Sequence, residues 1–261
     1  MRTTREIFDV LDALAPQALA MDWDNCGLQV GSRNRAVNRV LVALDPFEEV
    51  CREAEEMDAE LIVTHHPLFF PSASSINEDT AQGRAASMLI RGGRTLYSCH
   101  TNLDLAKGGV NDRLAQVLGL QHVEPIGAEG LLRRGTVEPQ PLEQFLVSVR
   151  DALGCPGLRY CDGGKPCNRI AVGGGACGSE LQEAVNSGCD TFVTADIKYN
   201  QFWDAQDFGI NLIDAGHFYT ENPVCAVLAN TLRRAFPELD VRISQKHRDC
   251  MKFFGRPVDF F

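Results

Sequence analysis

Apolar runs rich in β-branched residues alternate along the chain with segments of helical periodicity. The predicted strands cover residues 39–44, 60–66, 95–100, 169–175, 191–196 and 210–217. The predicted helices lie between them, at residues 46–57, 80–91, 109–118, 142–153, 178–187 and 221–235. Strands that alternate with helices indicate an α/β fold, which is the fold class that we predict.

Two parts of the chain repeat the same pattern. Asn38 and Asn168 are separated by 130 positions (168 − 38), and so are Thr64 and Thr194 (194 − 64). In each part a strand, a helix and a second strand follow in the same order, and a third strand then ends on a histidine. We therefore predict two similar α/β units that arose by internal duplication. The predicted units are residues 1–126 with 217–261, which carry the candidate metal ligands, and residues 127–216.

The first residues predict an amphipathic helix rather than a secretion signal. Thr3 and Glu6 have the spacing of a capping box, and Pro16 ends the helical pattern. The apolar stripe of this helix consists of Ile7, Phe8, Leu11 and Leu14. No apolar run in the chain has the length of a membrane span. We therefore expect a cytoplasmic protein that does not act at a membrane.

Charge and cysteine content narrow the range of functions. The net charge is −10, and no cluster of Lys and Arg is long enough to follow a phosphate backbone. Because charge neutralisation dominates nucleic-acid binding, we expect no direct binding to nucleic acid. The ten cysteines include no C-x-x-C pair, which indicates reduced thiols that mostly pack in the core. For Cys155, Cys161 and Cys167, a metal or redox role stays open beside core packing.

Histidines gather where the predicted strands end. The stretch "VTHHPLFF" places His65 and His66 at the end of the second strand, and His100 and His217 end two others. In open α/β sheets the active groups lie beyond the carboxyl ends of the strands, so we expect these side chains to meet. Neighbouring residues within a strand point to opposite faces of the sheet. The strand ends at His65 and His66, where Pro67 keeps the preceding residue extended, so this alternation no longer applies to the two histidines. Asp196 ends a further predicted strand.

Four short segments supply side chains of the kind that bind metal ions. They are His65 with His66, His100 with Asp104, His217 with Glu221, and Asp45 after the first strand. Mixed imidazole and carboxylate ligands suit Zn, Fe or Mn. Five ligand side chains are too many for one open catalytic ion, and they suit two ions about 3.5–4 Å apart with a bridging carboxylate.

Each of these residues also has a structural explanation. Asp104 could cap a turn, and Glu221 could stabilise the dipole of helix 221–235, which we expect to begin at Thr220 as N-cap. The remaining histidines, His122 and His247, are expected to be hydrogen-bonded structural residues.

A glycine-rich segment, "RIAVGGGACGSELQEAV", lies between a predicted strand and a predicted helix. Gly173, Gly175 and Gly178 match the G-x-G-x-x-G spacing of dinucleotide-binding loops, with Asp196 near the expected acidic position. The segment also suits a phosphate or anion cradle at Ser179, or a tight turn that binds nothing. If the two units face each other, this loop would lie opposite the metal ligands.

Several motifs together resemble the NIF3-like family, also called the dinuclear metal centre or GTP cyclohydrolase 1 type 2 homologue family. They are "MDWDNCGLQVG", "VTHHPLFF", "HTNLDLAKGGVNDRLA", "PGLRY", "RIAVGGGACGSEL" and "DAGHFYTE". The resemblance implies two intertwined α/β domains in each monomer and a toroidal homohexamer with metal pairs that face an internal cavity. Carried over by motif, the implied metal ligands are His65, His66, Asp104, His217 and Glu221. Glu221 would bridge two divalent ions, and His100 would lie beside them.

Two functions remain after this comparison of motifs. The first is a metal-dependent hydrolase that acts on a small molecule, either a nucleotide or another phosphorylated metabolite. Its ions would activate water, and His100 would act as catalytic acid or base because its ordinary pKa is near neutrality. The family name implies opening of the guanine ring of GTP. The alternative is a non-catalytic metal-binding or interaction scaffold, although five ligands for two ions leave positions open, as an enzyme requires.

Overall fold

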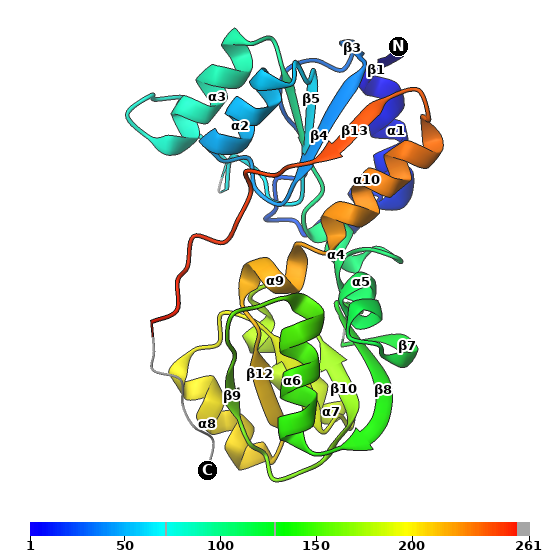
Figure 1. The fold of residues 1–261 in the computed structure, drawn as a ribbon, viewed down its shortest axis with the longest axis vertical. Coiled ribbons are helices and arrows are strands. Elements are labelled where there is room, and N and C mark those ends of the chain that lie inside the picture. Colours follow the sequence, from blue (N-terminus) through cyan, green and yellow to red (C-terminus); the bar gives the residue numbers. More distant parts are fainter. Residues whose placement is uncertain (71, 128, 255–261) are drawn as a thin grey trace.

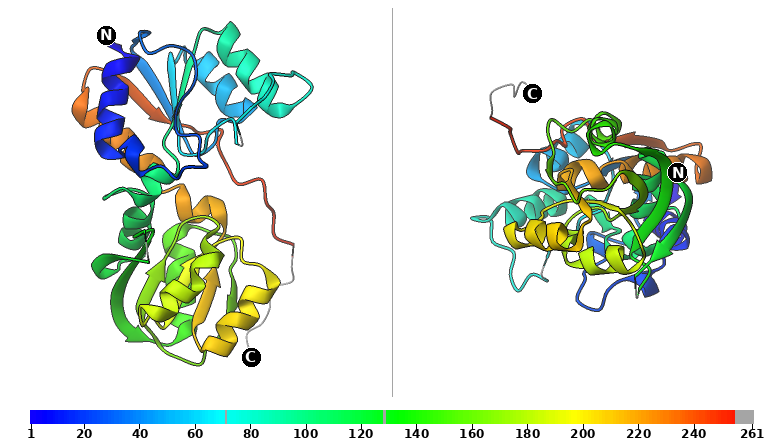
Figure 2. Two further views of the ribbon diagram at one scale, coloured as in Figure 1. Left: turned by 180° about the vertical axis from the view of Figure 1, so that it is seen from behind. Right: turned by 90° about the horizontal axis from the view of Figure 1, so that it is seen from below.

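The computed structural model describes residues 1–70, 72–127 and 129–254. The chain forms two α/β units, each built around its own sheet, which lie end to end (Figure 1). The chain passes from the first unit to the second through α4 (Thr101–Leu105) and α5 (Val110–Val117), and it returns through α9 (His217–Glu221) and α10 (Val224–Ala235). Residues 244–254 then run back along the outside towards the second unit (Figure 2). Residues 255–261 of the first predicted unit lie outside the described part.

The first sheet has five strands, and four of them are parallel. In spatial order they are β13 (Asp240–Ile243), β4 (Arg39–Ala43), β5 (Leu61–Thr64), β6 (Thr95–Ser98) and the antiparallel β2 (Gly27–Val30). One face packs on α10 and α1 (Thr4–Leu14), and the other on α2 (Glu48–Glu56) and α3 (Ala81–Arg91). Successive residues of β4 alternate between these two cores: Val40 and Val42 face α1, whereas Leu41 and Ala43 face α2.

Short elements complete the first unit. They are the ribbon of β1 (Arg2–Thr3) with β3 (Ala36–Val37), and the 3₁₀ turn η1 (Gln17–Leu19). The predicted capping box is confirmed, since Thr3 caps α1 and its hydroxyl accepts from the backbone N–H of Glu6. The apolar stripe of α1 is buried at Ile7, Phe8 and Leu11.

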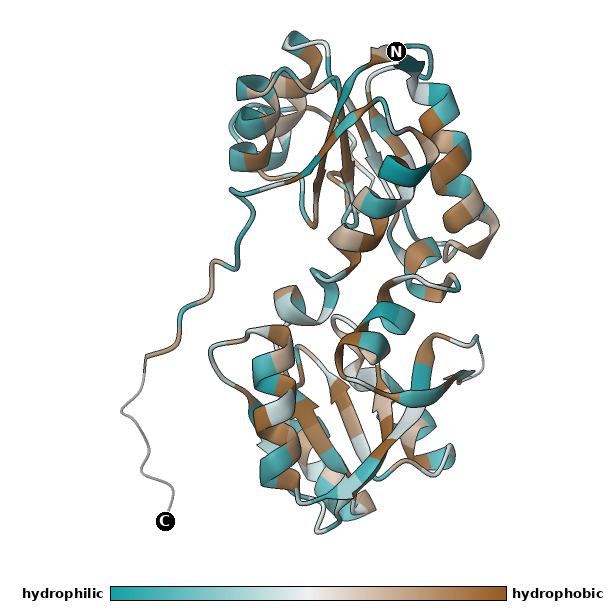
Figure 3. Cartoon of the chain, turned by 45° about the vertical axis from the view of Figure 1, so that its right-hand side comes forward, coloured by the Kyte–Doolittle hydropathy of each residue, from teal (hydrophilic) through white to brown (hydrophobic). Residues whose placement is uncertain are grey.

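The second sheet has six strands, of which three are parallel. In spatial order they are β7 (Gln121–Ile126), β8 (Leu132–Gln140), β10 (Cys167–Val172), β11 (Thr191–Thr194), β12 (Asn211–Asp214) and β9 (Arg159–Cys161). α5 and α6 (Leu142–Leu153) cover one face; η2 (Cys177–Glu180), α7 (Leu181–Asn186) and α8 (Tyr199–Phe208) cover the other. The parallel strands in the middle of the sheet are mostly hydrophobic, whereas the helices also carry hydrophilic residues (Figure 3).

The duplication extends to the strand register. Val40 pairs with Leu61 in the first sheet, and Ile170 pairs with Thr191 in the second, so both partners are shifted by 130 positions. A side-chain contact between the two strands is repeated as well: in each unit, a carboxylate just before the second strand accepts two backbone N–H groups at the start of the first strand. Glu60 accepts the backbone N–H of Asn38 and Arg39, and Asp190 accepts those of Asn168 and Arg169. The predicted α/β fold class with two similar units is therefore confirmed.

The division of the chain differs from the predicted boundary after residue 126. β7 pairs with β8 in the second sheet, and Leu114 and Ala115 of α5 pack in the core of the second unit. β7 and β8 are neighbouring antiparallel strands of one sheet, so residues 121–126 pair with the second sheet.

No helix in the described ranges is both long and apolar enough to cross a membrane.

Candidate metal centre

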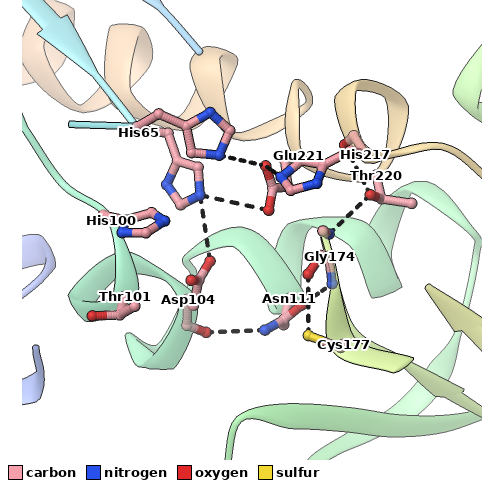
Figure 4. A network of polar contacts seen from close by, with 12 residues as sticks. His65, His100, Thr101, Asp104, Asn111, Gly174, Cys177, His217, Thr220 and Glu221 are labelled. Carbon is pink, nitrogen blue, oxygen red and sulfur yellow. Dashed lines mark hydrogen bonds and ion pairs between the residues drawn. The ribbon is translucent and has the colours of Figure 1, made fainter. Parts of the chain in front are cut away.

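The predicted ligands meet between the two units, at the carboxyl ends of both sheets. His65 and His66 directly follow β5, whereas Asp104 lies on α4 after β6. His217 and Glu221 lie on α9 after β12 of the other sheet. Figure 4 shows His65, Asp104, His217 and Glu221 converging from the two units. The strand-end prediction is thus correct in position, since parallel strands bring their carboxyl ends to one edge.

The two carboxylate oxygens of Glu221 face two different groups of side chains. Oε2 lies 3.0 Å from Nε2 of His66 and 3.0 Å from Nε2 of His217. Oε1 lies 3.8 Å from Nε2 of His65, and that nitrogen is 3.6 Å from Oδ1 of Asp104. The site therefore divides into a group around His66 and His217 and a group around His65 and Asp104, with Glu221 between them.

Three buried polar atoms at this point have no hydrogen-bond partner among the residues that the structure describes. They are His65 Nε2, Asp104 Oδ1 and Glu221 Oε2. An unpaired buried polar atom costs about 1–3 kcal/mol, so a folded protein rarely keeps several of them together without a ligand. Three such atoms that converge on one space fit a bound cation. The His/Glu groups of the site could hold a metal ion.

The outward nitrogen of every imidazole in the site is already engaged. Nδ1 of His65 donates to the Cys99 carbonyl at 2.8 Å, which leaves Nε2 as a lone-pair donor that faces the centre. Nδ1 is also engaged in the other three rings, where it contacts a carboxylate: His66 to Asp45 at 2.6 Å, His100 to Asp24 at 2.8 Å, and His217 to Asp196 at 2.8 Å. Histidines that ligate metals are oriented in this way by outer partners.

Carboxylates raise the pKa of two of these histidines. Burial lowers the pKa of His66, but the hydrogen bond to Asp45 and the nearby carboxylate of Glu221 outweigh it and raise the pKa to about 10. Burial likewise opposes the charge on His217, and Glu221 and Asp196 raise its pKa to about 9. Glu221 is buried too, yet its contacts with His217 and His65 hold its pKa well below the ordinary value. Burial raises the pKa of Asp104. A concentrated negative charge thus favours a cation here.

His100, the predicted catalytic residue, lies within the same cluster. Its ring centroid is 5.2 Å from that of His65 and 5.5 Å from that of His66, and the three rings could share an ion. Asp24 fixes the ring and also accepts the backbone N–H of Thr101 at 3.0 Å. Burial raises the pKa of Asp24, but hydrogen bonds from His100, Cys26 and Thr101 hold it well below its usual range. The sequence reasoning missed Asp24 as a partner.

The helix that carries Glu221 begins earlier than predicted. His217–Glu221 form one helical turn of their own, α9, and α10 begins at Val224. Gly216, at φ +82°, lets the chain turn directly into α9, and Pro223, which has no N–H, separates the two helices. Thr220 is therefore not an N-cap, and its hydroxyl accepts the N–H of Gly175 at 3.0 Å. His217 and Glu221 lie on one face, four residues apart.

The glycine-rich loop lies against the predicted ligands, and four of its backbone N–H groups are already paired. Gly173, Gly174, Gly175 and Cys177 donate their N–H groups to protein acceptors, which excludes a phosphate cradle and a dinucleotide loop at these amides. A Cβ atom on Gly175 would lie 2.1 Å from Glu221 Oε1 and 3.2 Å from His217 Nε2. The paired amides favour the tight-turn alternative at these positions, and glycine at position 175 leaves room for Glu221 and His217.

The cysteine trio does not form a cluster. Cys167 is buried in the core beneath α5 and α6, whereas Cys161 packs against the core on the opposite face of the sheet. Cys155 is buried as well, and all ten cysteines are free thiols. Core packing explains the trio, because two of its side chains are on different sides of one sheet.

Comparison with known proteins agrees with the motifs. The family model Duf34/NIF3 (NGG1p interacting factor 3) matches residues 2–249. A Clostridium perfringens protein named GTP cyclohydrolase 1 type 2 homolog is 35% identical over 258 residues, which cover 95% of this chain and 98% of the relative. A Helicobacter pylori protein named GTP cyclohydrolase 1 type 2 is 29% identical over 237 residues, 89% of this chain and 92% of the relative.

Solved structures share the fold over nearly the whole chain. A Staphylococcus aureus hypothetical protein superposes with a TM-score of 0.88 and 28% identity, and covers 97% of this chain and 99% of its own. A Bacillus cereus protein related to NIF3 has a TM-score of 0.89 at 24% identity, with the same coverage, which shows the fold alone. On the family match and these relatives, the chain belongs to the Duf34/NIF3 family.

Proposed function

We propose that the chain is a metal-dependent hydrolase that holds two divalent ions between its two units. His66 and His217 would bind one ion, His65 and Asp104 the other, and Glu221 would bridge them. The observation that carries this proposal is the division of contacts at Glu221, whose two oxygens face separate ligand groups.

The spacing of the ligand atoms supports this assignment. Zinc binds imidazole nitrogen at about 2.0–2.1 Å, so two ligands at a tetrahedral angle lie about 3.4 Å apart. The distances within the two groups, 3.0 Å from His66 to Glu221 and 3.6 Å from His65 to Asp104, bracket that value. Mixed nitrogen and oxygen donors suit Zn, Fe or Mn.

The protein side chains would position the reaction. When bound, the ions would supply Lewis acidity and a water nucleophile at neutral pH. Cys99, Asp45 and Asp196 hold the imidazoles with Nε2 towards the centre. His100 has Nδ1 engaged with Asp24, which leaves Nε2 to take up or deliver a proton to a substrate.

The substrate in this proposal is a nucleotide or another phosphorylated metabolite. The names of the relatives point to GTP. For this chain, the hydrolytic opening of the guanine ring is part of the proposal. The homohexamer is part of the proposal as well. A purely non-catalytic scaffold would be expected to close the coordination shell, whereas a cavity opens directly onto His66, His100 and Glu221.

Metal content measured by mass spectrometry tests the proposal. We expect two ions per wild-type chain, about one in the H65A and H66A variants, and fewer than one in E221A. The H122A variant is the matched control, because His122 is an exposed histidine on β7 away from the site. Less than about one ion in the wild-type protein would refute the dinuclear centre.

A screen of nucleotides and phosphoesters with the loaded protein tests the activity. Turnover should be present in the wild-type protein and in H122A and absent in E221A. Hydrolysis that persists in both H66A and E221A would reject the metal mechanism.

A further inference from the structure

A cavity of about 610 Å³ opens in front of the candidate ligands and has walls from both units. The first unit contributes Trp23 and Phe70, next to His100. The second unit contributes the glycine-rich loop together with Glu129 and Glu180. A substrate bound at the ligands must therefore fit between an aromatic wall and an acidic wall.

The aromatic wall is a pair of exposed rings. Trp23 is 63% exposed and Phe70 is 47% exposed, although burying large apolar side chains is favourable. The two rings contact each other edge to face with centroids 5.7 Å apart, and Phe70 makes a similar contact of 5.7 Å with His100. Trp23 precedes Asp24, whose hydrogen bonds to His100 and Thr101 fix this part of the loop. The rings thus form a fixed apolar surface one ring away from the ligands.

The opposite wall carries negative charge and offers little to an anion. Among the cavity residues within the described ranges there is no Lys and no Arg, while Glu129 and Glu180 add to the carboxylates of the site. The hydroxyl of Ser179 is already hydrogen-bonded to Glu180 at 3.1 Å, and the amides of Gly174 and Gly175 donate to protein acceptors. A polyphosphate that extended beyond the metal ligands would meet these glutamates and be repelled.

We infer that the substrate is a monophosphate ester that carries a planar aromatic ring, such as a nucleoside monophosphate. The ring lies on Trp23 and Phe70, and the single phosphate reaches the metal ligands. Hydrolysis forms a bond from the water oxygen to phosphorus and breaks the bond from phosphorus to the ester oxygen. The ester oxygen leaves as an alcohol with one proton, and phosphate is released. This inference rests on the proposed metal-dependent function and selects a phosphomonoester over GTP.

The test uses Trp23 as a fluorescent probe. The chain has two tryptophans, and the exposed Trp203 lies on α8, so a W203F background leaves Trp23 as the reporter. In metal-loaded W203F protein we expect GMP and guanosine to quench the fluorescence, with GMP bound more tightly than guanosine or GTP. The F70A variant should bind GMP and guanosine roughly tenfold more weakly, because a stacked ring is lost. Inorganic phosphate, which needs only the ions, should bind F70A and wild type equally.

The outcomes separate this inference from the proposed function. The E180Q variant should bring the affinity for GTP closer to that for GMP. Equal binding of GMP to F70A and wild type, or GTP binding as tight as GMP binding, would overturn the inference. A change of assembly state in F70A on size-exclusion chromatography would overturn it too, since the rings would then form a subunit contact. In metal-free E221A, guanosine should still quench Trp23, because the rings do not depend on the ions. If the wild-type protein bound guanosine but not inorganic phosphate, the proposed metal function would fail while the aromatic binding surface would stand.

Discussion

His247 donates its ring Nε2–H to Oδ2 of Asp45 at 2.8 Å, across 202 positions of the chain. The other oxygen of Asp45 binds Nδ1 of His66 at 2.6 Å, so one carboxylate joins a residue of the segment after β13 to a candidate ligand. The side chain of His247 is almost fully buried, and its ring packs 4.9 Å from that of Phe218, the neighbour of His217. His247 thus holds Asp45 in the position from which it orients His66.

Removal of this support should weaken metal binding. In H247A, Asp45 loses one of the two hydrogen bonds that hold it, and we expect the affinity of the ion at His66 to fall about 10- to 100-fold. H247Q should recover most of the affinity, because the glutamine amide can donate from nearly the same position as Nε2. Competition with a chelator measures the metal affinity of each variant, and H122A is the control. Equal losses in H247A and H247Q would contradict the hydrogen-bond role.

Substitution of Gly175 by alanine should abolish metal loading. The added Cβ would lie 2.1 Å from Glu221 Oε1, so the carboxylate that we propose as the bridge must move. Gly154 is the matched control, because it has the same φ of +65° but no atom within 4 Å of its added Cβ. Both variants carry the backbone strain of about 1–2 kcal/mol, while only G175A has the clash. If G154A lost as much metal as G175A, backbone strain rather than the clash would be the cause.

Metal binding should release protons. In the metal-free protein His66 has a pKa raised to about 10 and His217 a pKa raised to about 9, so both are charged at pH 7.5. Metal ions bind neutral imidazole, and loading therefore displaces about two protons per chain. Calorimetric titration in two buffers of different ionisation enthalpy measures this number. Identical heats in both buffers would show that the histidines are already neutral.

The same raised pKa values fix how the stability of the metal-free protein depends on pH. Both folded-state values lie above the ordinary value of 6.5, so the stabilisation is complete below about pH 6.5. It is lost as the pH rises through about 9 and 10, where His217 and His66 lose their protons. Urea unfolding with chelator present should give a free energy of unfolding that falls over this range. H66A should show a smaller fall than wild type.

Asn111 should contribute strongly to stability because its side chain links α4, the glycine-rich loop and Leu131, the residue before β8. Its side chain is buried; it accepts the N–H of Gly174 at 2.7 Å and donates to the Leu131 carbonyl at 2.9 Å. N111L would leave both groups unpaired and lower the free energy of unfolding by about 2–4 kcal/mol. The exposed Asn186 on α7 is the control, and N186L should change the free energy of unfolding by less than about 0.5 kcal/mol. Urea denaturation of the metal-free proteins measures the difference.

The sequence was sufficient for the parts of the fold that follow from local pattern. β-branched runs located the parallel strands other than β13, and the 130-residue offset anticipated that Val40–Leu61 and Ile170–Thr191 share one register. The ligands could be grouped in advance because the carboxyl ends of parallel strands meet. The antiparallel strands β7 and β9 were missed, since their residues are mostly exposed and lack a buried apolar run.

The outer partners of the site could not be predicted from local pattern. Asp24 and His100 are 76 positions apart, and Asp45 and His247 are 202 apart, so only the folded chain brings them together. The start of α9 was missed for a different reason. Thr220 and Pro223 have the composition of a helix start, but the positive φ of Gly216 lets the helical turn begin at His217 instead. Backbone conformation at one glycine thus outweighed two local preferences.

The order of the ligands along the chain has a consequence for biosynthesis. His66 is made early, but Glu221 comes 155 positions later (221 − 66), after the whole six-stranded sheet. His247, which steadies Asp45, follows only near the end of the chain. If His66 and Glu221 hold one ion, as we propose, that ion can bind only after the strands of both sheets up to β12 have been made, so it cannot guide the folding of the first residues alone.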